Sequence, residues 1–233
     1  MPPPVDLVSD AKLFLRKVPL LADLSESSLQ ALASASKLRR VDKGEFIFFQ
    51  FDPSDTAFLV RSGQISIILE SQDGRKLIIN EMHSGDFFGE VGVLTRHPRS
   101  SSAIARTDGE LILIPRLVFM SVLDAEPTLV RRMLEMTLSR LRDSSERESA
   151  LAFLDAQGRL ARLLLELGKR ELEKGYITIS QEELAERTGQ TRQTVAKALG
   201  RWRRAGWLIT GRGRIMLLNT AALDDLEKEW SPE

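Results

Sequence analysis

Residues 85–103, GDFFGEVGVLTRHPRSSSA, hold the side chains of this chain that are best suited to bind a ligand. Gly85 and Gly89 bracket a short apolar strand, and the pattern after Glu90 predicts a short helical turn. A glycine turn that opens a helix presents unpaired backbone N–H groups, which attract anions. Arg99 adds a planar cationic fork suited to phosphate, and Ser100 and Ser101 add hydroxyl donors.

Glu90 indicates what else the ligand carries. A phosphate would repel its carboxylate, so we expect this side chain to accept a hydrogen bond from a hydroxyl beside the phosphate, as on a ribose. Phosphate and ribose contacts within one short segment predict a nucleotide site. The alternative is a plain surface turn with a solvated Arg99, because each of these residue types is common.

The segment resembles the phosphate-binding cassette of cyclic-nucleotide-binding domains, in which Phe-Gly-Glu is followed by Pro-Arg and small residues. In that family the Glu binds the ribose 2′-hydroxyl, and the Arg and the next Ser or Thr bind the cyclic phosphate. The resemblance therefore implies nucleotide-binding residues at Gly89, Glu90, Arg99 and Ser100.

The composition excludes several other classes of protein. The 233 residues, with 42% hydrophobic and 28% charged content, fit one large or two small globular domains. No apolar run reaches the ~18 residues of a membrane span, and the N-terminal residues lack the pattern of a secretory signal, so we expect a cytoplasmic protein. The chain has no cysteine and only His83 and His97 as histidines, so we expect no metal site, no catalytic residue and no enzyme.

The net charge of zero hides a segregation of charge along the sequence. Residues 187–223 contain no Asp or Glu, and an acidic tail follows them. The basic residues of this stretch are Arg187, Arg192, Lys197, Arg201, Arg203, Arg204, Arg212 and Arg214. A local basic surface in a neutral protein predicts a polyanionic partner.

The hydrophobic periodicity divides the chain into a helical start, a β-rich middle and a long helix. Residues 12–36 have helical spacing, with Ser25 as an expected N-cap. From about Gly44, short alternating runs separated by Gly and Asp turns predict an antiparallel β-sandwich or roll, with a hairpin at DGR, 73–75. Helical spacing returns at Pro127 and continues to about residue 153.

This long helix carries a seam with alternating spacings of four and three residues. Its members are Val130, Leu134, Thr137, Leu141, Ser144, Glu148 and Leu151. The seam predicts a dimerisation helix, and the alternative is a helix that packs on its own β-domain through Met133 and Met136. The polar pair Ser144 and Ser145 either faces solvent or faces a ligand held against the helix.

Residues 178–219 have the pattern of a helix-turn-helix followed by a β-hairpin wing. Ser180 with Glu183 forms an expected capping box, and Gly189 lies at the sharp turn. Thr191 is the expected cap of the second helix, whose outward side chains include Arg192, Gln193, Thr194 and Lys197. Gly211-Arg212-Gly213 is a tight basic turn that would form the wing.

These outward residue types match the chemistry of DNA. Arg192 and Lys197 can donate to guanine O6 and N7, and Gln193 can pair with adenine or accept from cytosine. The residues suited to phosphate contacts are Thr191, Thr194, Arg212 and Arg214. The alternative is a solvated protein–protein surface.

The order of these segments resembles the bacterial catabolite activator (CRP/FNR) family, because the run LRDSSERESALAFLD, 141–155, is similar to its central helix and hinge. The resemblance implies an α+β fold with a cyclic-nucleotide-binding β-roll at 1–126, a dimerisation helix at 127–152 and a winged helix-turn-helix at 153–233. It also implies adenine contacts from Ser144 and Ser145, one from each subunit, and contact with RNA polymerase. On the recognition helix, Gln193 and Lys197 replace the Glu and Arg of the family.

We therefore expect a homodimeric transcription regulator that binds cAMP and inverted-repeat promoter DNA. Cyclic GMP or no ligand at all remain alternatives to cAMP. Further alternatives are a haem-based gas sensor, for which His83 is the candidate ligand, and a nucleotide-regulated enzyme or channel module.

Overall fold

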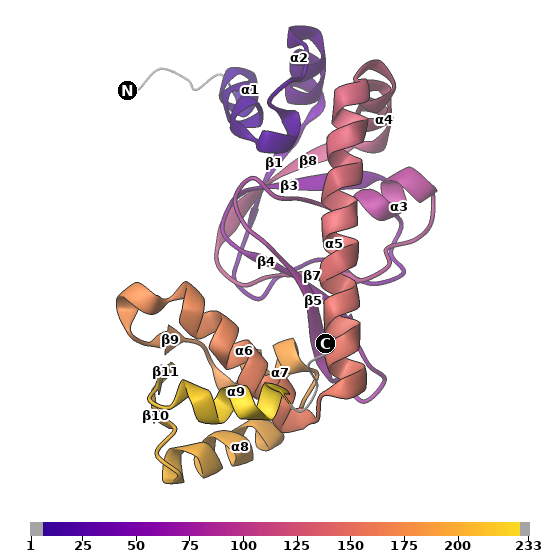
Figure 1. Cartoon of the computed structure of the whole chain (residues 1–233). Coiled ribbons are helices and arrows are strands. Elements are labelled where there is room, and N and C mark those ends of the chain that lie inside the picture. The colour runs from indigo at the N-terminus through magenta and orange to yellow at the C-terminus, as the bar shows by residue number, and fades with distance from the viewer. Residues whose placement is uncertain (1–6, 229–233) are drawn as a thin grey trace. The chain divides into compact units, whose positions relative to one another are not determined.

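The computed structural model describes residues 7–228, which divide into two compact units (Figure 1). The first unit contains the chain up to Leu69 and Ile79–Leu141, and the second contains Glu70–Ile78 and the chain from Arg142 onward. Within the described residues, none of the helices combines the length and the apolar composition needed to cross a bilayer.

A β-roll with helices at its ends makes up the first unit, except that the tip of one hairpin of the roll, Glu70–Ile78, is grouped with the second unit. Its helices are α1 (Leu7–Lys17), η1 (Pro19–Leu21), α2 (Glu26–Ala35), α3 (Glu90–Thr95) and α4 (Arg116–Ala125). The strands of the roll are β1 (Lys37–Val41), β2 (Phe46–Phe48), β3 (Thr56–Ser62), β4 (Ile65–Glu70), β5 (Lys76–Met82), β6 (Phe87–Phe88), β7 (Ser102–Ala105) and β8 (Gly109–Pro115). They form two four-stranded sheets, ordered β1-β8-β3-β6 and β2-β7-β4-β5.

The alternating runs of the sequence explain this arrangement. Strand β3 pairs antiparallel with both β8 and β6, and the register places Phe58 opposite Phe88. These two rings stack with centroids 5.1 Å apart and are buried together with Phe48, which fills the roll with aromatic side chains. The predicted antiparallel roll is confirmed, and the predicted hairpin at 73–75 is confirmed by the hydrogen bond from Ser71 N to Arg75 O.

Glu126 connects α2 to the end of α4. Ser25 caps α2, as predicted, by accepting from Ser28 N. The Glu126 carboxylate accepts from Ser25 N at 3.1 Å and from Ser28 Oγ at 2.6 Å. The hydroxyl of Ser25, then that of Ser28, then the Ser25 amide hold the pKa of Glu126 below its ordinary value, since each bond favours the charged carboxylate.

Helix α5 (Pro127–Phe153, 27 residues) begins at the predicted proline. Leu129 and Met133 are buried in the core of the first unit, as the alternative interpretation of this helix required for Met133. A different face of the same helix is exposed, with Val130, Leu134 and Leu141 at 49%, 58% and 60%. Thus α5 packs on its own domain and also leaves the aliphatic seam open.

The second unit contains the helix-turn-helix. Its elements are α6 (Ala156–Arg170), η2 (Leu172–Lys174), β9 (Ile177–Thr178), α7 (Gln181–Thr188), α8 (Arg192–Arg204), β10 (Leu208–Gly211), β11 (Arg214–Leu217) and α9 (Thr220–Lys228). The strands form an antiparallel sheet in the order β10-β11-β9. Val195, Leu199 and Trp202 bury the inner face of α8, as the sequence predicts.

The capping box at the start of α7 is only half formed. Ser180 Oγ accepts from Glu183 N at 3.0 Å, as predicted. The Glu183 carboxylate does not return this bond but accepts from Arg187 Nη2 at 2.7 Å. Arg187 lies one turn after Glu183 on the same helix face and offers a charged donor. This donor competes with the backbone N–H of Ser180 for the Glu183 carboxylate.

Candidate nucleotide site and nucleic-acid interface

The cassette begins with a glycine that no other residue could replace without strain. Gly89 has the left-handed φ of 74° and is the N-cap of α3, directly after strand β6. A Cβ at this position would lie 2.8 Å from Arg99 Nη1. The turn therefore needs glycine both for its backbone angle and for the close approach of the Arg99 guanidinium.

Arg99 is almost completely buried, with 5% of its surface exposed. Its Nη1 donates to Gly89 O at 2.7 Å and its Nη2 to Thr56 O at 2.6 Å. The guanidinium carbon lies 4.3 Å from the centroid of the Phe48 ring. The Nε has no hydrogen-bond partner among the described residues. The cassette thus holds a desolvated cation with an unused donor.

Burial lowers the pKa of Arg99, because an apolar environment disfavours the charged form. The carboxylates of Asp52, Asp55 and Glu90 act in the opposite direction and raise it. An arginine remains protonated under such conditions, so the site carries a fixed positive charge.

Glu90 is also buried, with 7% exposed, and it is held by the long helix α5. Arg140 Nη1 donates to Glu90 Oε1 at 2.9 Å, and Arg140 Nη2 donates to Phe87 O at 2.6 Å. One guanidinium therefore fixes both the carboxylate and the end of strand β6. The second oxygen of Glu90 remains available as an acceptor for another donor.

Our sequence interpretation did not include Arg140. The signal that could have found it is its position four residues before Ser144, on the same face of α5. Of the predicted ligand residues, the structure brings together Gly89, Glu90 and Arg99, with the exposed Ser100 directly after them. Ser144 and Ser145 belong to the second unit, and their contact with a ligand stays a prediction.

A loop beside the cassette fixes its position. Phe51 N donates to Arg99 O at 2.9 Å, and Arg99 N donates to Asp52 O at 3.0 Å. Gln50 Nε2 donates to Ser100 O at 3.1 Å. Arg99 is therefore held by its backbone and by its side chain, which preorganises the guanidinium.

His83, the residue that a haem sensor would require, has a 63% exposed side chain.

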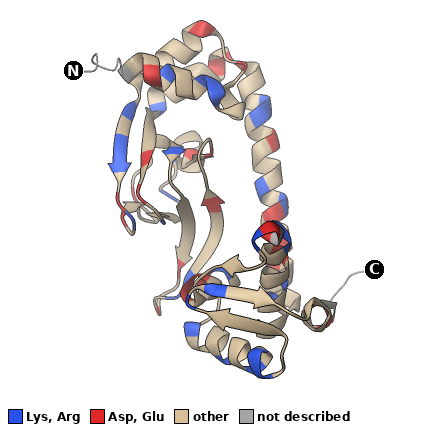
Figure 2. Cartoon of the chain, turned by 90° about the vertical axis from the view of Figure 1, so that its left-hand side faces the viewer, with Lys and Arg blue, Asp and Glu red and all other residues tan. Residues whose placement is uncertain are grey.

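The second candidate site is the exposed face of α8, a helix that contains several Lys and Arg residues (blue in Figure 2). Thr191 caps the helix by accepting from Thr194 N at 3.1 Å, as predicted. The exposed positions of this segment are Thr191, Arg192, Gln193, Thr194, Ala196, Lys197, Arg201, Arg203 and Arg204. Gly189 has the left-handed φ of 65° at the sharp turn before α8, and Arg212 lies at the tip of the wing between β10 and β11.

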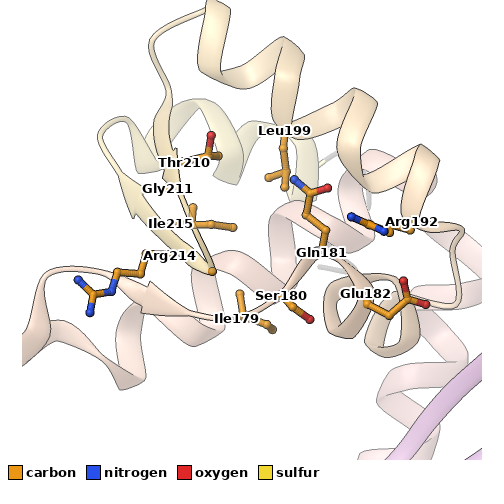
Figure 3. A pocket seen from close by; sticks show the side chains of 11 residues that line it. Ile179, Ser180, Gln181, Glu182, Arg192, Leu199, Thr210, Gly211, Arg214 and Ile215 are labelled. Atoms are coloured by element: carbon orange, nitrogen blue, oxygen red, sulfur yellow. The ribbon is translucent and has the colours of Figure 1, made fainter.

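A pocket of about 280 Å³ lies between the start of α7, α8 and the wing (Figure 3). Ile179, Leu199 and Ile215 form its apolar floor. Its polar wall consists of Ser180, Gln181, Glu182, Arg192, Thr210 and Arg214. Groups of this kind, at the start of a helix and beside a basic strand, can contact the sugars and phosphates of a nucleic-acid backbone.

A nucleotide cassette in a β-roll and a basic recognition helix in a winged helix define a class of transcription regulator with one domain for each ligand. Residues 38–126 match the family described as "Cyclic nucleotide-binding domain", and residues 158–226 match the "Crp-like helix-turn-helix domain". The chain belongs to the CRP/FNR family of transcription regulators.

Three relatives place the chain within this family. It is 32% identical to the "CRP-like cAMP-activated global transcriptional regulator" of Mycobacterium tuberculosis, over 76% of this chain and 84% of that protein. It is 27% identical to the "Cyclic AMP receptor protein" of Thermus thermophilus, over 89% and 96% of the two chains. The solved structure of the "c-di-GMP Responsive Global Regulator CLP" of Xanthomonas campestris has a TM-score of 0.75 and 28% identity, and the match covers 83% of this chain and 99% of that one.

The close approach of Gly89 and Arg99 predicts different costs for the same substitution at two glycines. Gly85 also has a left-handed φ, 92°, but a Cβ there would meet no atom within 4 Å. Gly85→Ala should lower the free energy of unfolding by about 1 kcal/mol through backbone strain alone. Gly89→Ala should lower the free energy of unfolding by more than Gly85→Ala, because the Arg99 side chain must also move. Equal losses in denaturant unfolding of the two variants would contradict the role of this contact.

Proposed function

We propose that the chain is a cytoplasmic, homodimeric transcription regulator that binds cAMP in the cassette and inverted-repeat promoter DNA through α8 and the wing. The observation that carries the ligand proposal is the buried guanidinium of Arg99, whose Nε has no hydrogen-bond partner among the described residues. A protein seldom buries an unpaired donor of a cation without a partner for it.

A cyclic phosphate supplies that partner. Its charge would compensate the burial of Arg99, whose terminal nitrogens donate only to neutral carbonyl groups in this structure. The free oxygen of Glu90 would accept the ribose hydroxyl, with Arg140 holding the carboxylate in place. Gly89 and Ser100 would add donors to the phosphate oxygens.

The choice of cAMP among nucleotides rests on the cassette and on two of the relatives. The names of the proteins from M. tuberculosis and T. thermophilus refer to cAMP, whereas the X. campestris regulator is described as responsive to c-di-GMP. We propose further that Ser144 and Ser145 contact the adenine. A ligand that binds one arrangement of α5 better than another would shift the dimer between DNA-binding states.

Replacement of Arg99 by Leu should weaken cAMP binding by about 2–5 kcal/mol, because a partly buried phosphate loses its charged partner. Arg96→Leu is the matched control, since it removes an exposed arginine from the same loop. Isothermal titration with cAMP, cGMP and c-di-GMP measures both variants, and thermal unfolding checks that they fold. Unchanged cAMP affinity in Arg99→Leu, or no binding of cAMP by the intact protein, would refute this ligand.

The dimer proposal rests on the exposed seam of α5. The seam residues Val130, Leu134 and Leu141 are 49–60% exposed, and so is Leu138 next to seam position Thr137, although each is a large aliphatic residue. Four such side chains along one helix are the pattern that a second copy of the helix buries.

Leu141→Lys should favour monomers and abolish binding to a two-half-site DNA, because it places two like charges in a desolvated seam. Leu117→Lys, on α4, is the control, because Leu117 is 83% exposed and lies outside the seam. Sedimentation velocity measures the state of assembly of both variants. An intact dimer in Leu141→Lys would mean that another face of the chain forms the interface.

We assign the base contacts in DNA to α8. Two recognition helices related by a two-fold axis require an inverted repeat with half-sites about 34 Å apart. Arg192 and Lys197 would donate to guanine, Gln193 would contact the neighbouring base pair, and Thr191, Thr194, Arg212 and Arg214 would bind phosphates. A surface that contacts RNA polymerase completes the proposed activity.

Arg192→Ala should cost about 1–3 kcal/mol on the preferred site and relax the preference at one base pair. Arg212→Ala should weaken binding to all sequences nearly equally. It should also reduce by about one unit the slope of the logarithm of the binding constant against the logarithm of the salt concentration. Binding-site selection, followed by titration at several salt concentrations, measures both quantities. If Arg192→Ala lost affinity equally for all sequences and Arg212→Ala changed the base preference, Arg212 would be the residue that reads bases and Arg192 the one that binds phosphate.

A further inference from the structure

We propose that Gln190 is a positioning residue: it fixes the direction of α8, the recognition helix, relative to the hinge at residues 153–155 and thereby sets the half-site spacing that the dimer accepts. This inference rests on the proposed binding of inverted-repeat DNA by a dimer. It concerns a buried side chain that does not face the DNA surface and that no sequence motif indicated.

Gln190 connects the starts of two helices. It directly precedes Thr191, the N-cap of α8, and it is only 8% exposed. Its Nε2 donates to the carbonyl oxygen of Ala156 at 2.8 Å. Ala156 is the first residue of α6, directly after the N-cap Asp155, so this hydrogen bond joins the start of the recognition helix to the hinge.

Three further hydrogen bonds, from two arginines, link the hinge and the first turn of α6 to the helix-turn-helix. Arg159 donates from Nη1 to Leu154 O at 2.7 Å and from Nε to Thr188 O at 3.1 Å. Arg201, near the end of α8, donates from Nη1 to Gln157 Oε1 at 3.0 Å. The first turn of α6 is therefore hydrogen-bonded to the segments at both ends of α8. A rotation at the hinge must carry α8 with it.

The other atom of the Gln190 amide bears on whether this side chain serves stability alone. Gln190 Oε1 is buried and has no hydrogen-bond partner among the described residues. A buried acceptor without a partner costs stability, and a methionine of similar length and shape would avoid that cost. The glutamine is therefore better explained by the direction that its single hydrogen bond imposes than by its contribution to stability.

The consequence for DNA recognition is specific. The exposed side chains of α8 determine which bases a half-site contains. The orientation of α8 relative to the hinge determines how far apart the two half-sites must be. Loss of the Gln190–Ala156 hydrogen bond should therefore change the spacing tolerance and leave the base preference unaltered.

The test compares the same substitution at two glutamines three positions apart, Gln190→Met and Gln193→Met, in the full-length protein with cAMP. Gln193 is exposed on α8 and is the matched control. Binding-site selection from a library with random half-sites and variable spacers gives the base preference and the spacing profile of each variant. Gln190→Asn, which keeps an amide but shortens its reach, is a second variant, and thermal unfolding is measured for all of them.

We expect the wild type to disfavour a spacer one base pair from the optimum by roughly tenfold, the ratio given by 1.4 kcal/mol of misfit. Gln190→Met and Gln190→Asn should reduce this ratio to roughly threefold or less, with base preference unchanged, and Gln190→Met should retain the melting temperature. Gln193→Met should alter base preference and leave the spacing profile intact.

Each other result overturns the inference in an identifiable way. A wild-type spacing profile in Gln190→Met and Gln190→Asn would show that Gln190 does not set the spacing. A large loss of melting temperature in Gln190→Met would make Gln190 a residue of the folded core only. Failure of the wild type to select any inverted repeat would refute the proposed function itself.

Discussion

The nucleotide-binding half of this protein depends on the burial of one guanidinium. Arg99 is desolvated in a roll lined by phenylalanines, and that burial requires compensation. The surrounding elements supply it in part: the glycine turn and strand β3 offer carbonyl oxygens, and a neighbouring loop holds the Arg99 backbone. The left-handed conformation of Gly89 and the lack of a side chain at this position let the guanidinium approach the turn, and Arg140 on α5 holds the neighbouring carboxylate of Glu90.

Local chemistry made much of the fold predictable from the sequence. The caps at Ser25, Ser180 and Thr191 form as expected, because each depends only on a hydroxyl and an amide three residues away. The strands of the roll and the inner face of α8 follow from periodicity. The capping box was predicted incorrectly in its second half, because Arg187 competes for Glu183 with a stronger, charged bond.

The sequence predicted those residues of the candidate sites that lie close together along the chain. The cassette residues lie in one segment, so their types and spacing indicated phosphate chemistry. The contacts of Arg140 and Gln190 could not be predicted in this way, because the two residues that they join are 50 and 34 positions apart in sequence. Such contacts arise from tertiary packing, which the periodicity of a helix does not encode.

The exposed aliphatic seam of α5 has a consequence for how the cell could control this regulator. If two chains bury Val130, Leu134 and Leu141 against each other, the folded, DNA-competent form is stabilised by mass action and its share grows with the number of copies in the cell. The rate of synthesis and degradation of the protein then acts as a second input beside the small molecule. A modest change in abundance near the dissociation constant of the dimer would alter promoter occupancy more steeply than it would for a monomeric regulator.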